Sequence, residues 1–149
     1  MNIETKTNTA LHVVKGAIAK TLGVKWTASV WVEGNHGRIA VQYDKKPTED
    51  EIAEIQRLTS QKISEDASIE VVEMNRGDAE DRWGEIIYDL FPLPEHIREL
   101  KIFNLPGWNV NACNKEHTST TGEIGNVIIT KARFRNSKQL LEVSFDVRD

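Results

Sequence analysis

An apolar stripe at helical spacing near the N-terminus constrains the fold more than any other feature. Apolar residues fall at positions 10, 13, 14, 17 and 18, the pattern of an amphipathic helix. Gly23 is expected to end this helix. At roughly 100° per residue, Asn8, His12, Gly16 and Ala19 share the opposite face. Because the neighbours of His12 on that face are small, another group could approach its ring.

Alternating patterns along the rest of the chain predict strands. Residues 26–33 alternate, 34–37 resemble a turn, and 38–43 complete a hairpin. A second helix is expected over 47–58, where Thr48 and Glu51 form a capping box. Further strands are predicted at 69–74, 101–105, 127–135 and 140–147, the last two joined near Asn136 and Ser137. This mixed order predicts an α+β fold, with helices packed on a mostly antiparallel sheet.

Length and composition limit the class of protein. The 149 residues suit a single domain over 1–149. No apolar run is long enough to span a bilayer and no signal peptide is evident, so we expect a soluble, cytoplasmic protein without a membrane partner. The single cysteine, Cys113, excludes an intrachain disulfide. The formal net charge of −4 means that a nucleic-acid partner has to meet a local basic patch.

Cys113 and His117 have the spacing C-x-x-x-H. A thiolate and an imidazole four residues apart can reach one zinc ion from a helical or tightly turned backbone. Together with His12 they would give three protein ligands and an open position, as in catalytic zinc sites. The alternative is a buried free cysteine and a surface histidine, because this spacing often arises by chance. The remaining histidines are better explained without a metal, His36 in the predicted turn and His96 at the surface.

Three stretches closely resemble a known family: TNTALHVVKG, KWT and NVNACNKEHTSTTGEIG. They are similar to the free-standing alanyl-tRNA editing proteins of the AlaX type, which are related to the editing domains of alanyl- and threonyl-tRNA synthetases. The resemblance runs in order over essentially the whole chain. It implies the synthetase editing-domain fold (the second additional domain) and a single tRNA-editing domain over 1–149. It also implies an aminoacyl-tRNA hydrolase that deacylates seryl-tRNA of the alanine type, with tRNA as its partner and zinc as its cofactor.

In this family, H-x-x-x-H and C-x-x-x-H bind one zinc ion. His12, Cys113 and His117 match three of the ligands, but Asn8 stands at the fourth position. Three interpretations stay open. Asn8 could be a helix N-cap beside a zinc with three protein ligands. Its side-chain oxygen could be a weak fourth ligand. The metal could be lost, leaving a protein that binds without cleaving or cleaves without metal. The first two predict weaker metal retention than four protein ligands give.

The resemblance also implies substrate contacts. Thr27 matches a hydroxyl residue that favours serine over alanine, and a site that hydrogen-bonds the hydroxyl discriminates better than an apolar pocket. Threonine is equally a good strand former. Gly122 and Gly125 match the glycines beside the pocket and could bring backbone close to the terminal adenosine, although turn geometry also explains them. Zinc would either activate the attacking water or position the aminoacyl group, and no residue suggests a covalent nucleophile.

A basic stretch near the C-terminus could bind RNA. Lys131, Arg133 and Arg135 alternate along a predicted strand, with Lys138 past the turn, and could contact acceptor-stem phosphates. In the alternative, a two-residue loop pairs Lys131 with Glu142 across strands. Lys15 and Lys20 of the first helix would add positive charge near the site.

Three other functions stay open beside the zinc-dependent editing of seryl-tRNA. They are a tRNA- or aminoacyl-binding module that has lost its metal, a deacylase for another mischarged tRNA, and a small protein with a purely structural zinc, which would unfold on chelation.

Overall fold

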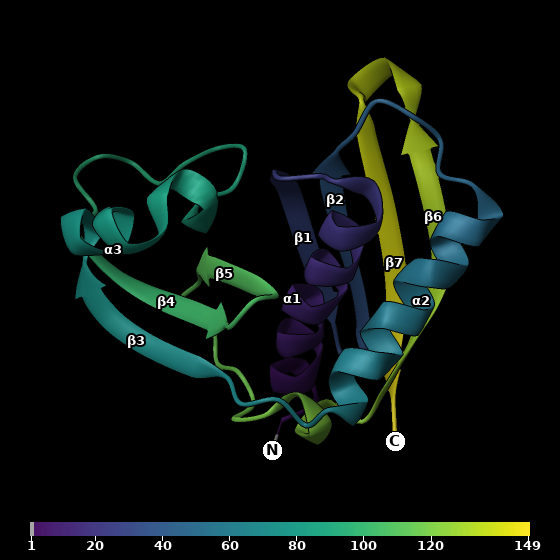
Figure 1. The fold of residues 1–149 in the computed structure, drawn as a ribbon, viewed down its shortest axis with the longest axis horizontal. Coiled ribbons are helices and arrows are strands. Elements are labelled where there is room, and N and C mark those ends of the chain that lie inside the picture. Colours follow the sequence, from purple (N-terminus) through teal and green to yellow (C-terminus); the bar gives the residue numbers. More distant parts are fainter. Residues whose placement is uncertain (1) are drawn as a thin grey trace.

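The computed structural model describes residues 2–149 and contains two antiparallel sheets on either side of a long helix, α1 (Figure 1). The larger sheet has the strand order β1-β2-β7-β6, and the smaller one has the order β3-β4-β5. The strands of the larger sheet are β1 (Thr27–Glu33), β2 (His36–Gln42), β6 (Asn126–Arg135) and β7 (Leu140–Arg148). Those of the smaller sheet are β3 (Glu70–Asn75), β4 (Glu99–Leu105) and β5 (Asn109–Ala112). The predicted α+β class and the antiparallel pairing are confirmed.

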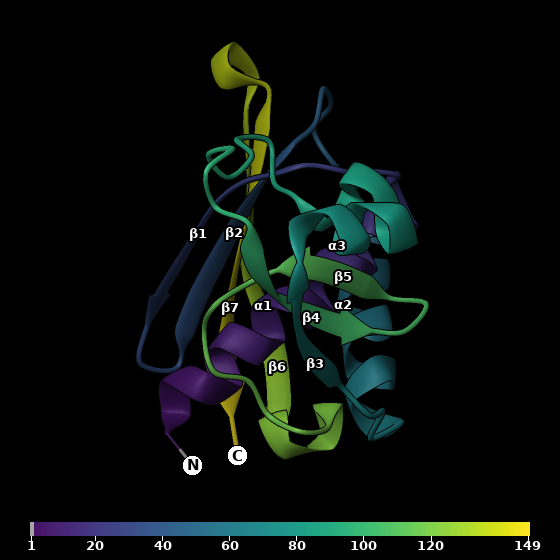
Figure 2. The same cartoon turned by 90° about the vertical axis from the view of Figure 1, so that its left-hand side faces the viewer.

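Helices α1 (Ile3–Leu22) and α2 (Glu49–Ser64) cover one face of the larger sheet, and α3 (Arg76–Trp83) packs on the smaller sheet. The apolar stripe of α1 meets Ile39, Ile55 and Phe145 in the main core, so its opposite side is left for the smaller sheet. Figure 2 shows that smaller sheet in front of α1. A site on this side of α1 therefore lies where the two sheets approach each other.

The first helix begins earlier than its apolar stripe indicated. Asn2 is the N-cap, since its side-chain oxygen accepts a hydrogen bond of 2.7 Å from the Glu4 N–H. The first turns are polar, and Thr9 bonds back to the Thr5 carbonyl at 2.8 Å. The N-cap interpretation of Asn8 is therefore wrong, because Asn8 lies inside the helix. Gly23 ends the helix with a φ of 74°, as predicted.

The second helix has the predicted capping box. Thr48 Oγ1 accepts from the Glu51 N–H at 3.1 Å, and the Glu51 carboxylate accepts from the Thr48 N–H at 2.9 Å. His36, expected in a turn, is instead the first residue of β2, where its Nδ1 lies 2.6 Å from Asp146 Oδ1.

The register of the last hairpin differs from the prediction. Its connection is a 3₁₀ turn, η3 (Asn136–Lys138), followed by Gln139 with a φ of 53°, rather than a two-residue loop. Together with an irregularity between Ile129 and Lys131, this longer connection sets Arg133 opposite Glu142 and Lys131 opposite Ser144. The pair of Lys131 with Glu142, which was the alternative to RNA binding, is therefore wrong.

The described residues contain no helix that is long and apolar enough to cross a membrane.

Candidate metal centre

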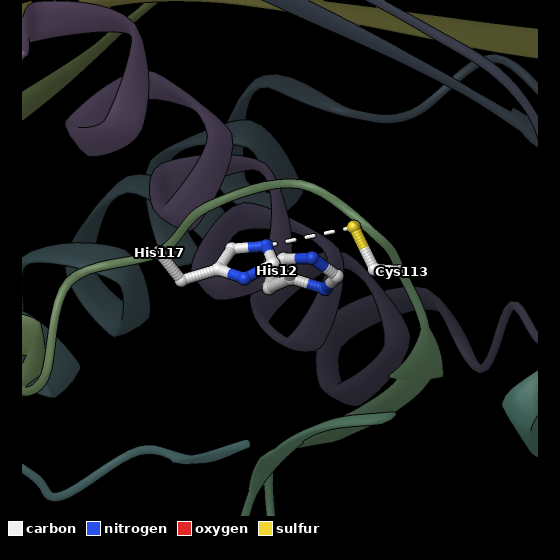
Figure 3. A group of neighbouring side chains, drawn as sticks. All are labelled: His12, Cys113 and His117. Carbon is white, nitrogen blue, oxygen red and sulfur yellow. Dashed lines mark hydrogen bonds between the residues drawn. The ribbon is translucent and has the colours of Figure 1, made fainter. Parts of the chain in front are cut away.

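Three side chains from two distant parts of the chain meet on the side of α1 that faces the smaller sheet. His12 lies in the middle of α1, Cys113 directly follows β5, and His117 lies further along the same loop. One candidate ligand atom from each lies within 4.8 Å of the others. Figure 3 shows the three side chains pointing toward one another, with Cys113 Sγ 3.5 Å from His117 Nε2. A bent loop, rather than a helix, brings Cys113 and His117 together.

The ring of His12 is held in one orientation. Its Nδ1 lies 2.8 Å from Asn109 Oδ1, and its ring stacks on Phe103 with centroids 3.8 Å apart. An amide oxygen can only accept, so Nδ1 carries the hydrogen and donates it. The lone pair then resides on Nε2, the nitrogen available to a metal.

The loop that carries the other two candidate ligands is attached at both ends. The Cys113 N–H donates to the Lys101 carbonyl at 2.9 Å. The Thr118 N–H donates to Thr9 Oγ1 of α1 at 2.9 Å, and this bond is buried. Thr9 therefore fixes the loop beside His117 to the helix that carries His12.

The protonation states suit a metal ion. Burial lowers the pKa of His12 to about 4, while the hydrogen bond that its ring donates to Asn109 opposes this shift and the Lys15 charge adds to it. Burial lowers the pKa of His117 to about 3, helped by the charges of His12, Lys101 and Lys115. Both imidazoles are thus neutral at neutral pH. Burial raises the pKa of the Cys113 thiol, so a metal would have to displace its proton.

Unpartnered polar atoms provide a further test of the fit to a metal. Asn8 Oδ1 and His117 Nδ1 are buried and have no hydrogen-bond partner among the described residues. Asn8 lines a cavity of about 70 Å³ together with His12 and Cys113. Two imidazoles and one thiol form a donor set that zinc accepts, and the unpartnered amide oxygen of Asn8, a residue that lines the cavity, is compatible with a weak fourth ligand.

Thr27 lies beside this cluster, buried at the start of β1, and lines the same cavity. Lys15 donates to Thr27 Oγ1 at 2.7 Å. Asp89 and Asn111 also line the cavity, and the Asn111 side chain donates to the Ile87 carbonyl at 2.9 Å. Asp89 lies outside every motif of the sequence, whereas Asn111 lies within the stretch NVNACNKEHTSTTGEIG but had no role predicted there.

The two glycines of the predicted pocket loop lie after His117, at the 3₁₀ turn η2 (Thr121–Ile124). The Gly122 N–H donates to Asp66 Oδ1 at 3.1 Å, and a Cβ there would collide with the same side chain. Gly125 has a φ of 92°, and a Cβ there would lie 2.7 Å from the Arg148 carbonyl. Neither glycine lines the 70 Å³ cavity. Their role beside the substrate stays a prediction, and the structure gives each a packing role.

The basic residues of the last hairpin are not brought to the cluster. Lys131 and Arg133 are exposed on β6, Lys138 lies in the turn after it, and Arg135 lies 3.5 Å from Glu142. The sheet order places β6 at the opposite edge from β1, the strand of Thr27 (Figure 1). Of Lys15 and Lys20, the two lysines of α1 that were expected near the site, only Lys15 lines the cavity, while Lys20 Nζ lies 5.3 Å from the ring centre of Trp108.

Comparison with known proteins relates this chain to alanine–tRNA ligases, although no family model matches it. The ligase of Methanopyrus kandleri is 32% identical over 126 residues, which are 84% of this chain and 14% of the ligase. The ligase of Methanococcus aeolicus is 31% identical over 139 residues, 92% of this chain and 15% of the ligase. The chain is homologous to one segment of alanine–tRNA ligases. Because this segment is only 14–15% of the two ligases, the activity of the whole ligase does not carry over to the chain. The homology confirms the predicted relationship to alanyl-tRNA proteins and is consistent with an editing domain of the AlaX type.

Proposed function

We propose that this chain is an aminoacyl-tRNA hydrolase that releases serine wrongly attached to the tRNA for alanine. The observation that carries the proposal is the convergence of His12, Cys113 and His117 beside a small cavity that Thr27 lines. Homology to alanine–tRNA ligases supports a tRNA partner. A cavity of about 70 Å³ suits a small amino-acid side chain, as serine has.

His12, Cys113 and His117 would hold one zinc ion, which when bound acts as a Lewis acid or as an anchor for the aminoacyl group. Asn109 holds His12 in the tautomer that leaves Nε2 free. Phe103 packs against the His12 ring and keeps water from that side. Asn8 completes the wall of the cavity, either as a weak fourth ligand or as the neighbour of an open position.

Thr27 would recognise the substrate. Serine differs from alanine by one hydroxyl, and a hydrogen bond to that hydroxyl discriminates strongly because its absence leaves a buried partner unsatisfied. Thr27 is buried at 4% exposure, so water replaces such a bond poorly. Gly122 and Gly125 would lie toward the terminal adenosine.

The basic residues of the last hairpin would contact tRNA away from the reacting ester. We include Lys131, Arg133, Arg135 and Lys138 as phosphate contacts, since Lys131 and Arg133 are exposed and each carries a positive charge. Arg133→Glu should weaken tRNA binding and reduce its dependence on salt, whereas an unchanged salt slope would reject this assignment. A role in translation fidelity would place the protein in the cytoplasm.

The decisive experiment is deacylation of seryl-tRNA of the alanine type, with correctly charged alanyl-tRNA in parallel. Each substrate is tested before chelation, after chelation and after zinc repletion. We expect selective release of serine that chelation abolishes and zinc restores. Cys113→Ala should lose this activity and bound zinc, while His36→Ala, a histidine outside the site, should keep both. A folded protein that releases no serine with added zinc would refute the proposal.

Asn8 favours a second candidate, a binding module without catalysis, because a histidine is absent at the fourth ligand position. That candidate predicts binding of seryl-tRNA without release of serine. Release of a different amino acid from its tRNA would indicate a deacylase with another specificity. Unfolding on chelation, without turnover, would indicate a purely structural zinc.

A further inference from the structure

Lys15 carries a cationic side chain from α1 into the cavity. It follows His12 by three residues, so the two side chains leave the helix on the same side. Lys15, His12 and Thr27 all line the 70 Å³ cavity. The Lys15 ammonium group donates to Thr27 Oγ1 at 2.7 Å and to the Lys25 carbonyl at 3.1 Å. Lys15 therefore connects α1, which carries His12, with β1, the strand of the candidate specificity residue Thr27.

The Lys15–Thr27 bond fixes the direction in which the Thr27 hydroxyl can act. An ammonium group has only donors, so Thr27 Oγ1 is the acceptor in this bond. The hydroxyl hydrogen of Thr27 then has to point elsewhere. Within residues 2–149 the structure shows no hydrogen bond donated by that hydroxyl. It is therefore available to an oxygen atom that enters the cavity.

The Lys15 ammonium group is not neutralised by a close carboxylate. Among the described residues it forms no ion pair within 4.0 Å, although Asp89 lines the same cavity and its charge opposes the pKa shift of Lys15. Burial lowers the pKa of Lys15 to about 8, so keeping the ammonium group here costs folding free energy. The helix nevertheless carries this charge beside the threonine hydroxyl.

We propose that Lys15 is a positioning residue for substrate specificity, which holds Thr27 as a hydrogen-bond donor toward the side-chain hydroxyl of the substrate. This inference rests on the proposed function, in which serine is the side chain recognised. A serine oxygen accepts the bond that Thr27 offers. Alanine offers no acceptor and leaves the oriented hydroxyl unsatisfied. Without Lys15, the Thr27 hydroxyl is free to rotate and to form a hydrogen bond with a group other than the substrate, so selectivity for serine over alanine falls.

The test compares the binding of two stable analogues, the non-hydrolysable seryl and alanyl amides of aminodeoxyadenosine, by calorimetry. Lys15→Met keeps the apolar stem and removes the donors. Thr27→Val keeps the shape and removes the hydroxyl. Lys20→Met is the matched control, an exposed lysine of the same helix. Metal content and thermal stability are recorded for every variant, because a merely structural role would change these properties without changing the seryl-to-alanyl ratio.

We expect wild type and Lys20→Met to prefer the seryl analogue. In Lys15→Met the ratio of the affinities for the seryl and alanyl analogues should fall about tenfold, as the loss of one hydrogen bond implies. Thr27→Val should lose at least as much, and the double variant no more than Thr27→Val alone, because Lys15 acts through Thr27. An unchanged ratio in Lys15→Met, or losses that add in the double variant, would overturn the inference. If Lys15→Met does not fold, Lys15→Gln replaces it. Its side chain is shorter and uncharged, and the ratio of seryl to alanyl affinity is again expected to fall.

The two proposals fail separately. Wild type that releases no serine from seryl-tRNA refutes the hydrolase but leaves the analogue ratios to decide the role of Lys15. If wild type deacylates seryl-tRNA selectively but Lys15→Met keeps the wild-type ratio of seryl to alanyl affinity, only the role of Lys15 is refuted. Wild type that binds both analogues equally refutes it as well, since there is then no hydroxyl selectivity to position.

Discussion

Lys15→Met is expected to stabilise the folded chain at neutral pH, even though it impairs selectivity. Burial lowers the pKa of Lys15 from its ordinary value of 10.5 to about 8, so folding disfavours the charged form. The gap between these two values corresponds to about 3 kcal/mol. Lys15 is only partly buried and loses two hydrogen bonds in the variant, so we expect a net gain of about 1–2 kcal/mol in the free energy of unfolding.

The sign of the pH dependence follows from the same values. Above pH 8 the folded state releases the Lys15 proton, while the unfolded state keeps it up to 10.5. The unfolded state therefore binds more protons at Lys15 in this window, and the contribution of Lys15 to the stability of wild type rises with pH. Below about pH 8 the cost of the charge is fully present. The advantage of Lys15→Met should thus be largest at neutral pH and shrink as the pH approaches 10.5.

The assay is urea unfolding of metal-free wild type, Lys15→Met and Lys20→Met at several pH values from about 7 to 10. The difference between variants cancels the titration of groups that they share. Lys20 is exposed, so its replacement should leave the unfolding free energy close to that of wild type. A Lys15→Met protein less stable than wild type at neutral pH, or an advantage that does not change with pH, would refute the reasoning.

Three other substitutions test the architecture of the site. Asn8→His should restore a fourth ligand and slow the loss of zinc to a chelator by at least about tenfold. Equal rates of zinc loss from the variant and from wild type would show that position 8 does not reach the metal. Thr9→Val removes the acceptor of the buried Thr118 N–H. It should lower the free energy of unfolding, measured in urea, by about 1–3 kcal/mol and weaken zinc binding. A zinc affinity equal to that of wild type would contradict this. Gly16→Ala places a Cβ against Trp108, so it should destabilise by about 1–3 kcal/mol and shift tryptophan fluorescence, despite the better helix propensity of alanine. A stabilised Gly16→Ala protein would contradict that packing.

Local signals in the sequence predicted the elements that depend on neighbouring residues. The stripe of α1, its end at Gly23 and the capping box of Thr48 all involve residues within a few positions of one another. The start of α1 was missed because its polar first turns are stabilised by Asn2 and by threonine side chains bonded back to the helix. The register of the last hairpin was missed because an irregularity within β6 and a longer turn shift it, and neither has a clear sequence signal.

The residues of the site, like the elements of the fold, were predicted only in part. Spacing and family resemblance pointed to His12, Cys113 and His117, which the structure brings together. The residues that hold them were not predictable, because Asn109 lies 97 positions from His12 and Thr118 lies 109 from Thr9. Such pairs depend on how the two sheets enclose α1, and a single sequence does not contain that information.

Helix α1 explains why these parts form one site. Asn8, His12 and Lys15 stand at i, i+4 and i+7, so one face of a single helix presents the candidate fourth ligand, a histidine ligand and the lysine that orients Thr27. The opposite face is buried in the main core, which holds the helix rigid. Cys113 and His117, in contrast, lie in a loop fixed to α1 by Thr9. Loss of metal should therefore loosen this loop while the face of α1 and the Lys15–Thr27 bond persist, so substrate recognition should survive a chelation that abolishes hydrolysis.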